Sequence, residues 1–226
     1  MRLRNNLGQV LYEAMRGLAP GPGPGYIPLM PVETHVPTRE EALALFLKYN
    51  ATESLRGHAL SVEAVMRHYA RKYGEDEEKW GIIGLVHDID YEQFPAEHCR
   101  RSPEILREAG FPEEYIRAVV SHGWGICSEV EPVHRMEKVL YTIDELTGLV
   151  KASALMRPSR SVLDIEASSV KKKWKDARFA AGVNRAVIEK GAAMLGVEMG
   201  ELITDTIAGM RTAAKEIGLA GTAAGS

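Results

Sequence analysis

The chain has 226 residues, enough for one well-packed core with at most a small appendage. Its composition, 45% hydrophobic and 26% charged residues, argues against a disordered chain, a fibre and a solenoid. A net charge of −3 argues against a protein that coats nucleic acid or an anionic membrane, and we expect neither as a partner.

The first part of the chain differs from the rest. Residues 3–16 have apolar positions at helical spacing and predict a short helix. Residues 20–31 are rich in Pro and Gly, which indicates a linker or an extended strap.

From Thr38 onward the pattern is helical throughout. Thr38 and Glu41 have the spacing of a capping box, and Gly74 is a typical helix stop. Charged first turns, prolines and glycines delimit the remaining segments. The predicted helices cover residues 38–49, 52–73, 75–89, 102–109, 112–122, 132–154, 166–176, 183–195 and 198–217. No segment has a convincing strand period, so we predict an all-α fold.

This pattern divides the chain into three parts. Residues 1–36 hold the N-terminal helix and strap, residues 37–218 form the helical domain, and residues 219–226 form a frayed tail. The two cysteines, Cys99 and Cys127, lack CxxC spacing, so we expect free thiols. Free thiols, together with the lack of a bilayer-spanning apolar run, favour a soluble cytoplasmic protein.

Histidines and aspartates carry the chemical signal. His87 and Asp88 follow the apolar run Ile82–Val86, where an uncompensated carboxylate would be costly. A metal ion compensates it, because it binds neutral imidazole and ionised carboxylate together. His58 and His122 also lie on or beside apolar helical stripes. The remaining histidines outside the site are interpreted as surface or structural residues: His35, His68 and His134.

Four stretches place these residues in a recognisable order: LRGHALSVEAVM, GLVHDIDYEQFPAEH, AVVSHGWG and VLYTIDELTGL. The order His, His-Asp, His, His, Asp resembles the HD superfamily of metal-dependent phosphohydrolases, over about residues 50 to 155. The resemblance implies a helical bundle with the metal site in its core. Asp90 stands where the HDIG variant has glycine, and there is no GYP motif, which argues against a cyclic-dinucleotide phosphodiesterase of that kind.

The resemblance also implies roles for six residues. One metal would be held by His58, His87, Asp88 and Asp144, and a second by His98 and His122, with the catalytic Asp88 bridging the two. His98 in a loop and His122 in a core could instead be ordinary surface and core residues, which would leave one metal. The cofactor is thus one or two divalent transition metals, with manganese, iron, cobalt and nickel all suited to these ligands.

The expected reaction is hydrolysis of a phosphate ester of a small metabolite or nucleotide by a metal-bound, bridging hydroxide. A phosphorylated substrate needs positive charge near the metals. Lys151 lies two helical turns after Asp144, and Arg157 and Lys171 follow it, so we expect these three to bind substrate.

Two alternatives stay open. The same ligand set also resembles the mixed-valence di-iron oxygenases of this scaffold, and iron content with oxygen consumption would separate the two classes. A degenerate HD domain acting as a ligand-binding module is the third interpretation, but the complete ligand set argues against it.

Overall fold

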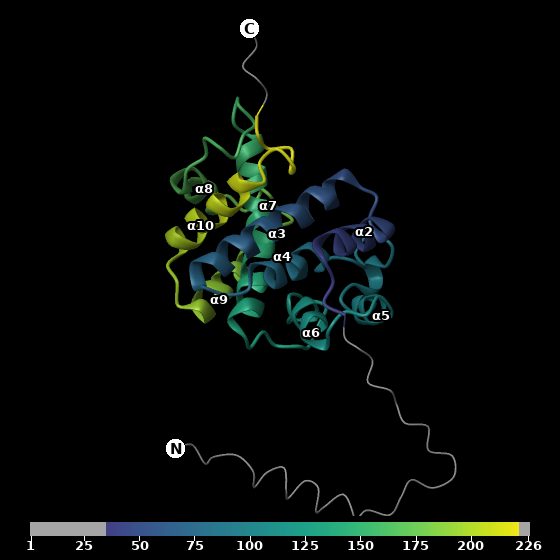
Figure 1. The fold of residues 1–226 in the computed structure, drawn as a ribbon. Helices are drawn as coiled ribbons and strands as arrows, with labels where there is room; N and C mark the ends of the chain where they lie inside the picture. The colour runs from purple at the N-terminus through teal and green to yellow at the C-terminus, as the bar shows by residue number, and fades with distance from the viewer. Residues whose placement is uncertain (1–34, 222–226) are drawn as a thin grey trace, which may run out of the picture. The chain divides into compact units, whose positions relative to one another are not determined.

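The structure is a computed structural model, and it describes residues 35–221. This part of the chain is all-helical and contains no strand, only two isolated β-bridges. The helices, shown in Figure 1, are α2 (Arg39–Tyr49), α3 (Glu53–Tyr73), α4 (Glu77–Val86), the 3₁₀ turn η1 (Pro95–Glu97), α5 (Ser102–Glu108), α6 (Glu113–Ser121), α7 (Arg135–Leu155), α8 (Ala167–Trp174), α9 (Arg185–Leu195) and α10 (Met199–Thr212). The all-α prediction is confirmed; the helix at 3–16 and the strap at 20–31 lie outside the described residues.

The helix ends follow the capping signals. Thr38 and Glu41 form the predicted capping box of α2, and Gly74 ends α3 in the left-handed region with φ 68°. Helix α7 begins three residues later than the predicted start at 132. The Glu137 carboxylate accepts hydrogen bonds from the backbone N–H groups of Val133 and His134, which holds these residues outside the helix.

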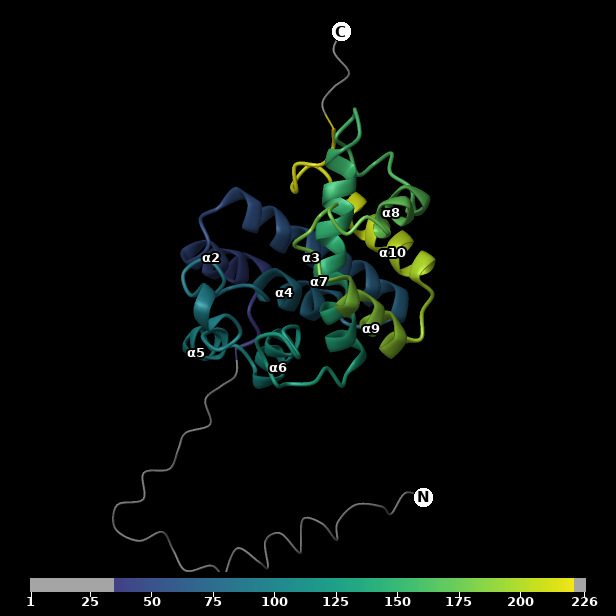
Figure 2. The same cartoon turned by 180° about the vertical axis from the view of Figure 1, so that it is seen from behind.

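Helices α3, α4 and α7 run through the middle of the molecule. Figures 1 and 2 show α2, α5 and α6 on one side of them and α8, α9 and α10 on the other. Helix α3 packs against α4, α7 and α10, and α7 also packs against α9. Four of the six predicted metal ligands therefore come from, or directly follow, the central helices: His58, His87, Asp88 and Asp144.

Helices α3 and α4 approach each other closely at Gly84. A Cβ atom built on Gly84 would lie 2.9 Å from Cγ of Met66 and 3.2 Å from the carbonyl oxygen of Val62. Real Cβ atoms have almost no such contacts, so this helix spacing depends on glycine.

The end of the described chain packs on the domain. Leu219 is buried, and its carbonyl oxygen accepts a hydrogen bond from Val162 N–H at 2.8 Å. Leu219 therefore belongs to the core, although the sequence pattern assigned it to a frayed tail. Within residues 35–221, no helix combines the length and apolar character needed to cross a membrane.

Candidate metal centre

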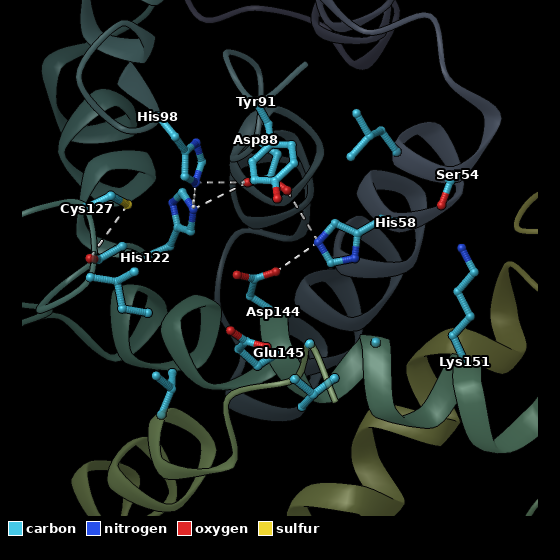
Figure 3. Close-up of a pocket in the computed structure, with 17 residues that line it drawn as sticks. Ser54, His58, Asp88, Tyr91, His98, His122, Cys127, Asp144, Glu145 and Lys151 are labelled. Carbon is cyan, nitrogen blue, oxygen red and sulfur yellow. Dashed lines mark hydrogen bonds and ion pairs between the residues drawn. The ribbon is translucent and has the colours of Figure 1, made fainter. Parts of the chain in front are cut away.

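The six predicted metal ligands lie close together, and five of them line one cavity of about 450 Å³. They arrive from different elements: His58 from α3, His87 and Asp88 directly after α4, His98 after η1, His122 at the end of α6, and Asp144 from α7. Figure 3 shows His58, Asp88, His98, His122 and Asp144 pointing toward one another. His87 is fully buried beside them.

One cluster consists of His58, His87 and Asp144, whose ligand atoms all lie within 4.8 Å of one another. Oδ1 of Asp144 is 2.9 Å from Nε2 of His58 and 3.3 Å from Nε2 of His87. Two imidazole nitrogens thus converge on one carboxylate oxygen.

A second cluster consists of Asp88, His98 and His122. The Nε2 atoms of the two histidines are 3.3 Å apart, and each lies 3.5 Å from Oδ1 of Asp88. This is the same convergence of nitrogen and oxygen donors as in the first cluster.

Asp88 lies between the clusters and faces both. Its Oδ1 atom belongs to the second cluster, whereas Oδ2 is 3.3 Å from Nε2 of His87 and 3.5 Å from Nε2 of His58. A carboxylate with one oxygen toward each cluster has the arrangement of a ligand that bridges two metal ions.

The opposite ring nitrogens fix how the imidazoles are oriented. Nδ1 of His87 donates to the carbonyl oxygen of Gly84 at 2.8 Å, and Nδ1 of His122 donates to that of Val119. Nδ1 of His98 donates to the Asp90 carboxylate at 2.8 Å. A neutral imidazole that donates from Nδ1 presents a lone pair at Nε2, the usual arrangement of a metal-ligating histidine.

These residues fit a bound cation. Nε2 of His87 is buried and has no hydrogen-bond partner in the part of the chain that the structure describes. It nevertheless faces carboxylate oxygens of Asp88 and Asp144, each 3.3 Å away. Lone pairs and carboxylates that face one another repel unless a positive charge lies between them.

The pKa shifts within the cluster also indicate a site for positive charge. Burial alone would raise the pKa of Asp88, but the neighbouring His87, His122 and His58 outweigh burial and hold it well below its usual value. Burial alone would likewise lower the pKa of His87, yet Asp88 and Asp144 raise it well above its usual value. The site therefore favours ionised carboxylates with positive charge beside them.

Asp90 is a site residue that the sequence argument missed. It is fully buried and accepts hydrogen bonds from Nδ1 of His98 and from the backbone N–H of Ser102, both at 2.8 Å. We noted it only as a departure from a glycine pattern. Its signal was an acidic residue in the same buried stretch as His87 and Asp88.

Other cavity residues also escaped prediction, among them Ser54, Tyr91, Glu145 and Cys127. The pKa of Glu145 is raised, chiefly by burial, although its carboxylate accepts a hydrogen bond from Asn184 N–H at 2.9 Å. In the sequence, only its position next to Asp144 could have indicated that Glu145 lies at the cavity.

The three expected substrate-binding residues are not brought together. Lys151 lines the cavity. Arg157 does not, and pairs instead with Asp164, at 3.0 and 3.1 Å. Lys171 is exposed on α8, and its ammonium group lies against Gly200, also away from the cavity.

The histidines outside the cluster have their own partners. His35 is exposed and contacts Glu41 at 2.8 Å, and His134 is exposed at the start of α7. His68, interpreted as a surface residue, is partly buried, and its Nε2 atom lies 3.1 Å from the Asp205 carboxylate.

Comparison with known proteins identifies the domain that carries this cluster. A family model described as the HD domain matches residues 55–166, a range that contains all six clustered residues. No curated protein and no solved structure gave a significant match. HD domains bind divalent metal ions, and the clusters described above could hold such ions. Through residues 55–166 the chain belongs to the HD-domain family of metal-dependent hydrolases.

Proposed function

We propose that the protein is a phosphohydrolase that holds two divalent metal ions and hydrolyses a phosphate ester of a small metabolite or nucleotide. The observation that carries the proposal is the position of Asp88, with one carboxylate oxygen toward each cluster. His58, His87 and Asp144 would complete one metal position, and His98 and His122 the other.

Two divalent ions held here would lower the pKa of a water molecule at the site and offset the charge that grows on the phosphoryl oxygens. The chain's own residues hold and orient the reacting groups. The Nδ1 hydrogen bonds of His87, His98 and His122 keep their Nε2 atoms aimed at the clusters. No protein nucleophile is needed for this reaction.

Lys151 would bind the substrate phosphate. It lines the cavity, and none of the residues 35–221 forms an ion pair with it, so its charge remains available to an anion. The cavity volume of about 450 Å³ suits a small ligand. Leu55, Tyr91 and Val183 contribute apolar surface for the non-phosphate part of the substrate.

The deciding experiment measures metal identity and stoichiometry on protein purified without chelator, for the wild type and His98→Ala. We expect two ions per chain in the wild type and one in the variant, with activity in a panel of phosphate esters. One ion in both proteins would contradict the dinuclear proposal. Iron at both positions with oxygen consumption would assign the oxygenase alternative instead.

Lys151 can be tested separately. Lys151→Ala should raise KM for a phosphate ester about tenfold, since one charge-assisted contact is lost. Lys138→Ala is the matched control, because Lys138 lies on the same helix but does not line the cavity. Equal KM values for the two variants would exclude a phosphate contact by Lys151.

A further inference from the structure

A third group of metal-binding side chains adjoins the second cluster. The Sγ atoms of Cys99 and Cys127 and a ring nitrogen of His98 all lie within 4.8 Å of one another. Cys99 is buried, and Cys127 lines the same cavity as the histidines. Figure 3 shows Cys127 on the His98–His122 side of the cavity, away from His58.

The backbone is shaped to bring the two sulfurs together. Cys99 has a φ of 64°, the left-handed region that a non-glycine residue enters only at a cost of about 1–2 kcal/mol. Strained residues of this kind gather at functional sites. After α6 the chain turns back, and Cys127 N–H donates to the carbonyl oxygen of Gly123 at 3.0 Å.

Gly123 leaves the space that the sulfurs occupy. A Cβ atom built on Gly123 would lie 2.2 Å from Sγ of Cys127 and 2.5 Å from Sγ of Cys99. Both thiols therefore rest against a backbone position where any side chain would displace them. The segment after η1, which carries Cys99, therefore meets the segment after α6, which carries Cys127.

The thiols are in a state suited to ligation. Both cysteines are free. Their sulfur atoms face a ring nitrogen of His98, and a thiol gives up its proton when it binds a metal ion. Thiolate and imidazole together are donors that favour thiophilic ions such as Zn²⁺ and Cd²⁺ over Mn²⁺.

We propose that His98, Cys99 and Cys127 form a separate site for a thiophilic metal ion, and that this site competes for His98 with the Asp88–His98–His122 cluster. His98 has only one nitrogen to offer, because its Nδ1 donates to Asp90. An ion held by the two sulfurs and His98 therefore removes a ligand from the second cluster. This inference holds whichever reaction the cavity supports.

The test is a Cd²⁺ titration of the reduced, chelator-free protein, followed through the ultraviolet sulfur-to-cadmium charge-transfer band. The chain has 2 cysteines, so any such band comes from Cys99 and Cys127. We expect a band that saturates at one Cd²⁺ per chain. In protein preloaded with Mn²⁺, saturation should reduce bound Mn²⁺ from two ions to one.

Cys127→Ser is the variant of choice, because Cys127 is less buried than Cys99 and its replacement leaves the strained backbone of Cys99 untouched. The variant should bind Cd²⁺ at least tenfold more weakly in this titration. It should still bind two Mn²⁺ ions and keep the wild-type circular dichroism spectrum. No band in the wild type, or an undiminished band in the variant, overturns the site. A band that forms while both Mn²⁺ ions remain bound overturns the competition for His98.

Discussion

Buried carboxylates are neutralised in two different ways in this molecule. The Glu63 side chain is only 4% exposed, and its Oε1 atom lies 2.6 Å from Nε of Arg39 and 2.9 Å from Nε of Arg67. Two guanidinium groups of the chain itself thus compensate the charge of Glu63. The side chains of Asp88 and Asp144 are 11% and 21% exposed, and their close partners are imidazoles.

The difference separates a structural carboxylate from a ligand. Among the ion pairs formed within residues 35–221, no lysine or arginine pairs with Asp88 or Asp144. A guanidinium at this point would stabilise the fold but would also occupy the place of a cation. The chain supplies its own positive charge at Glu63 and leaves it to a bound ion at the HD-domain cluster.

The largest effect is expected from Asp88→Asn. This change removes the charge shared by both clusters, so we expect loss of both bound metals and hydrolysis reduced by at least about a thousandfold. Metal analysis and a phosphate-ester assay measure the two losses. Because no lysine or arginine of residues 35–221 pairs with Asp88, the metal-free variant should keep the wild-type helical content, measured by circular dichroism. A clear loss of helical content would make Asp88 a structural residue like Glu63.

Glu63→Gln should have the opposite profile. It leaves Arg39 and Arg67 without their shared carboxylate, and breaking such a buried pair costs about 3 kcal/mol. Chemical denaturation would measure the loss, and metal stoichiometry should stay at the wild-type value. If Glu63→Gln instead released metal, the separation between the two kinds of carboxylate would be wrong.

A smaller effect is expected from Asp90→Asn. The amide weakens the hydrogen bond that orients His98 and places a donor against the backbone N–H of Ser102. Partners of ligating histidines typically contribute a factor of about 10 to 100 in metal affinity. Titration with Mn²⁺ should show this weakening at one of two positions; equal weakening at both would mean a general disturbance of the loop.

The smallest effect concerns Glu78, which shares Arg67 with Glu63 but is largely exposed. Its hydrogen bonds to Arg67 lower the pKa of Glu78 below 4.5. The pair therefore stabilises the fold at pH values above the ordinary carboxyl pKa and loses this contribution as pH falls through the lowered pKa. Glu78→Gln should cost about 0.5 kcal/mol at pH 7 and nothing near pH 2. Denaturation curves at the two pH values give the comparison, and a difference independent of pH would exclude this ion pair as the cause.

The fold and the cluster differ in how far the sequence could predict them. Helical periodicity and caps such as Thr38 and Gly74 act within a few residues, so the helices were predicted to within a few positions. The clustered histidines and aspartates were found because their order along the chain carries the signal.

The surroundings of Arg157 and the contact between the two cysteines depend on packing between segments that are distant in sequence. Arg157 lies just beyond the end of α7, where the chain turns and Asp164 meets its guanidinium. No periodicity encodes that turn, so the proximity of Arg157 to Asp144 along the chain was misleading. The contact of Cys99 with Cys127 likewise depends on a left-handed residue and a turn at Gly123, which are tertiary features.

Gly84 connects the packing of the core with the dimensions of the metal centre. It allows α3 and α4 to approach each other, and its carbonyl oxygen also receives the Nδ1 hydrogen bond of His87. Any side chain at this position would push apart the two helices that carry His58 and lead into His87. The separation of His58 and His87 thus depends on the volume of a residue that belongs to neither cluster.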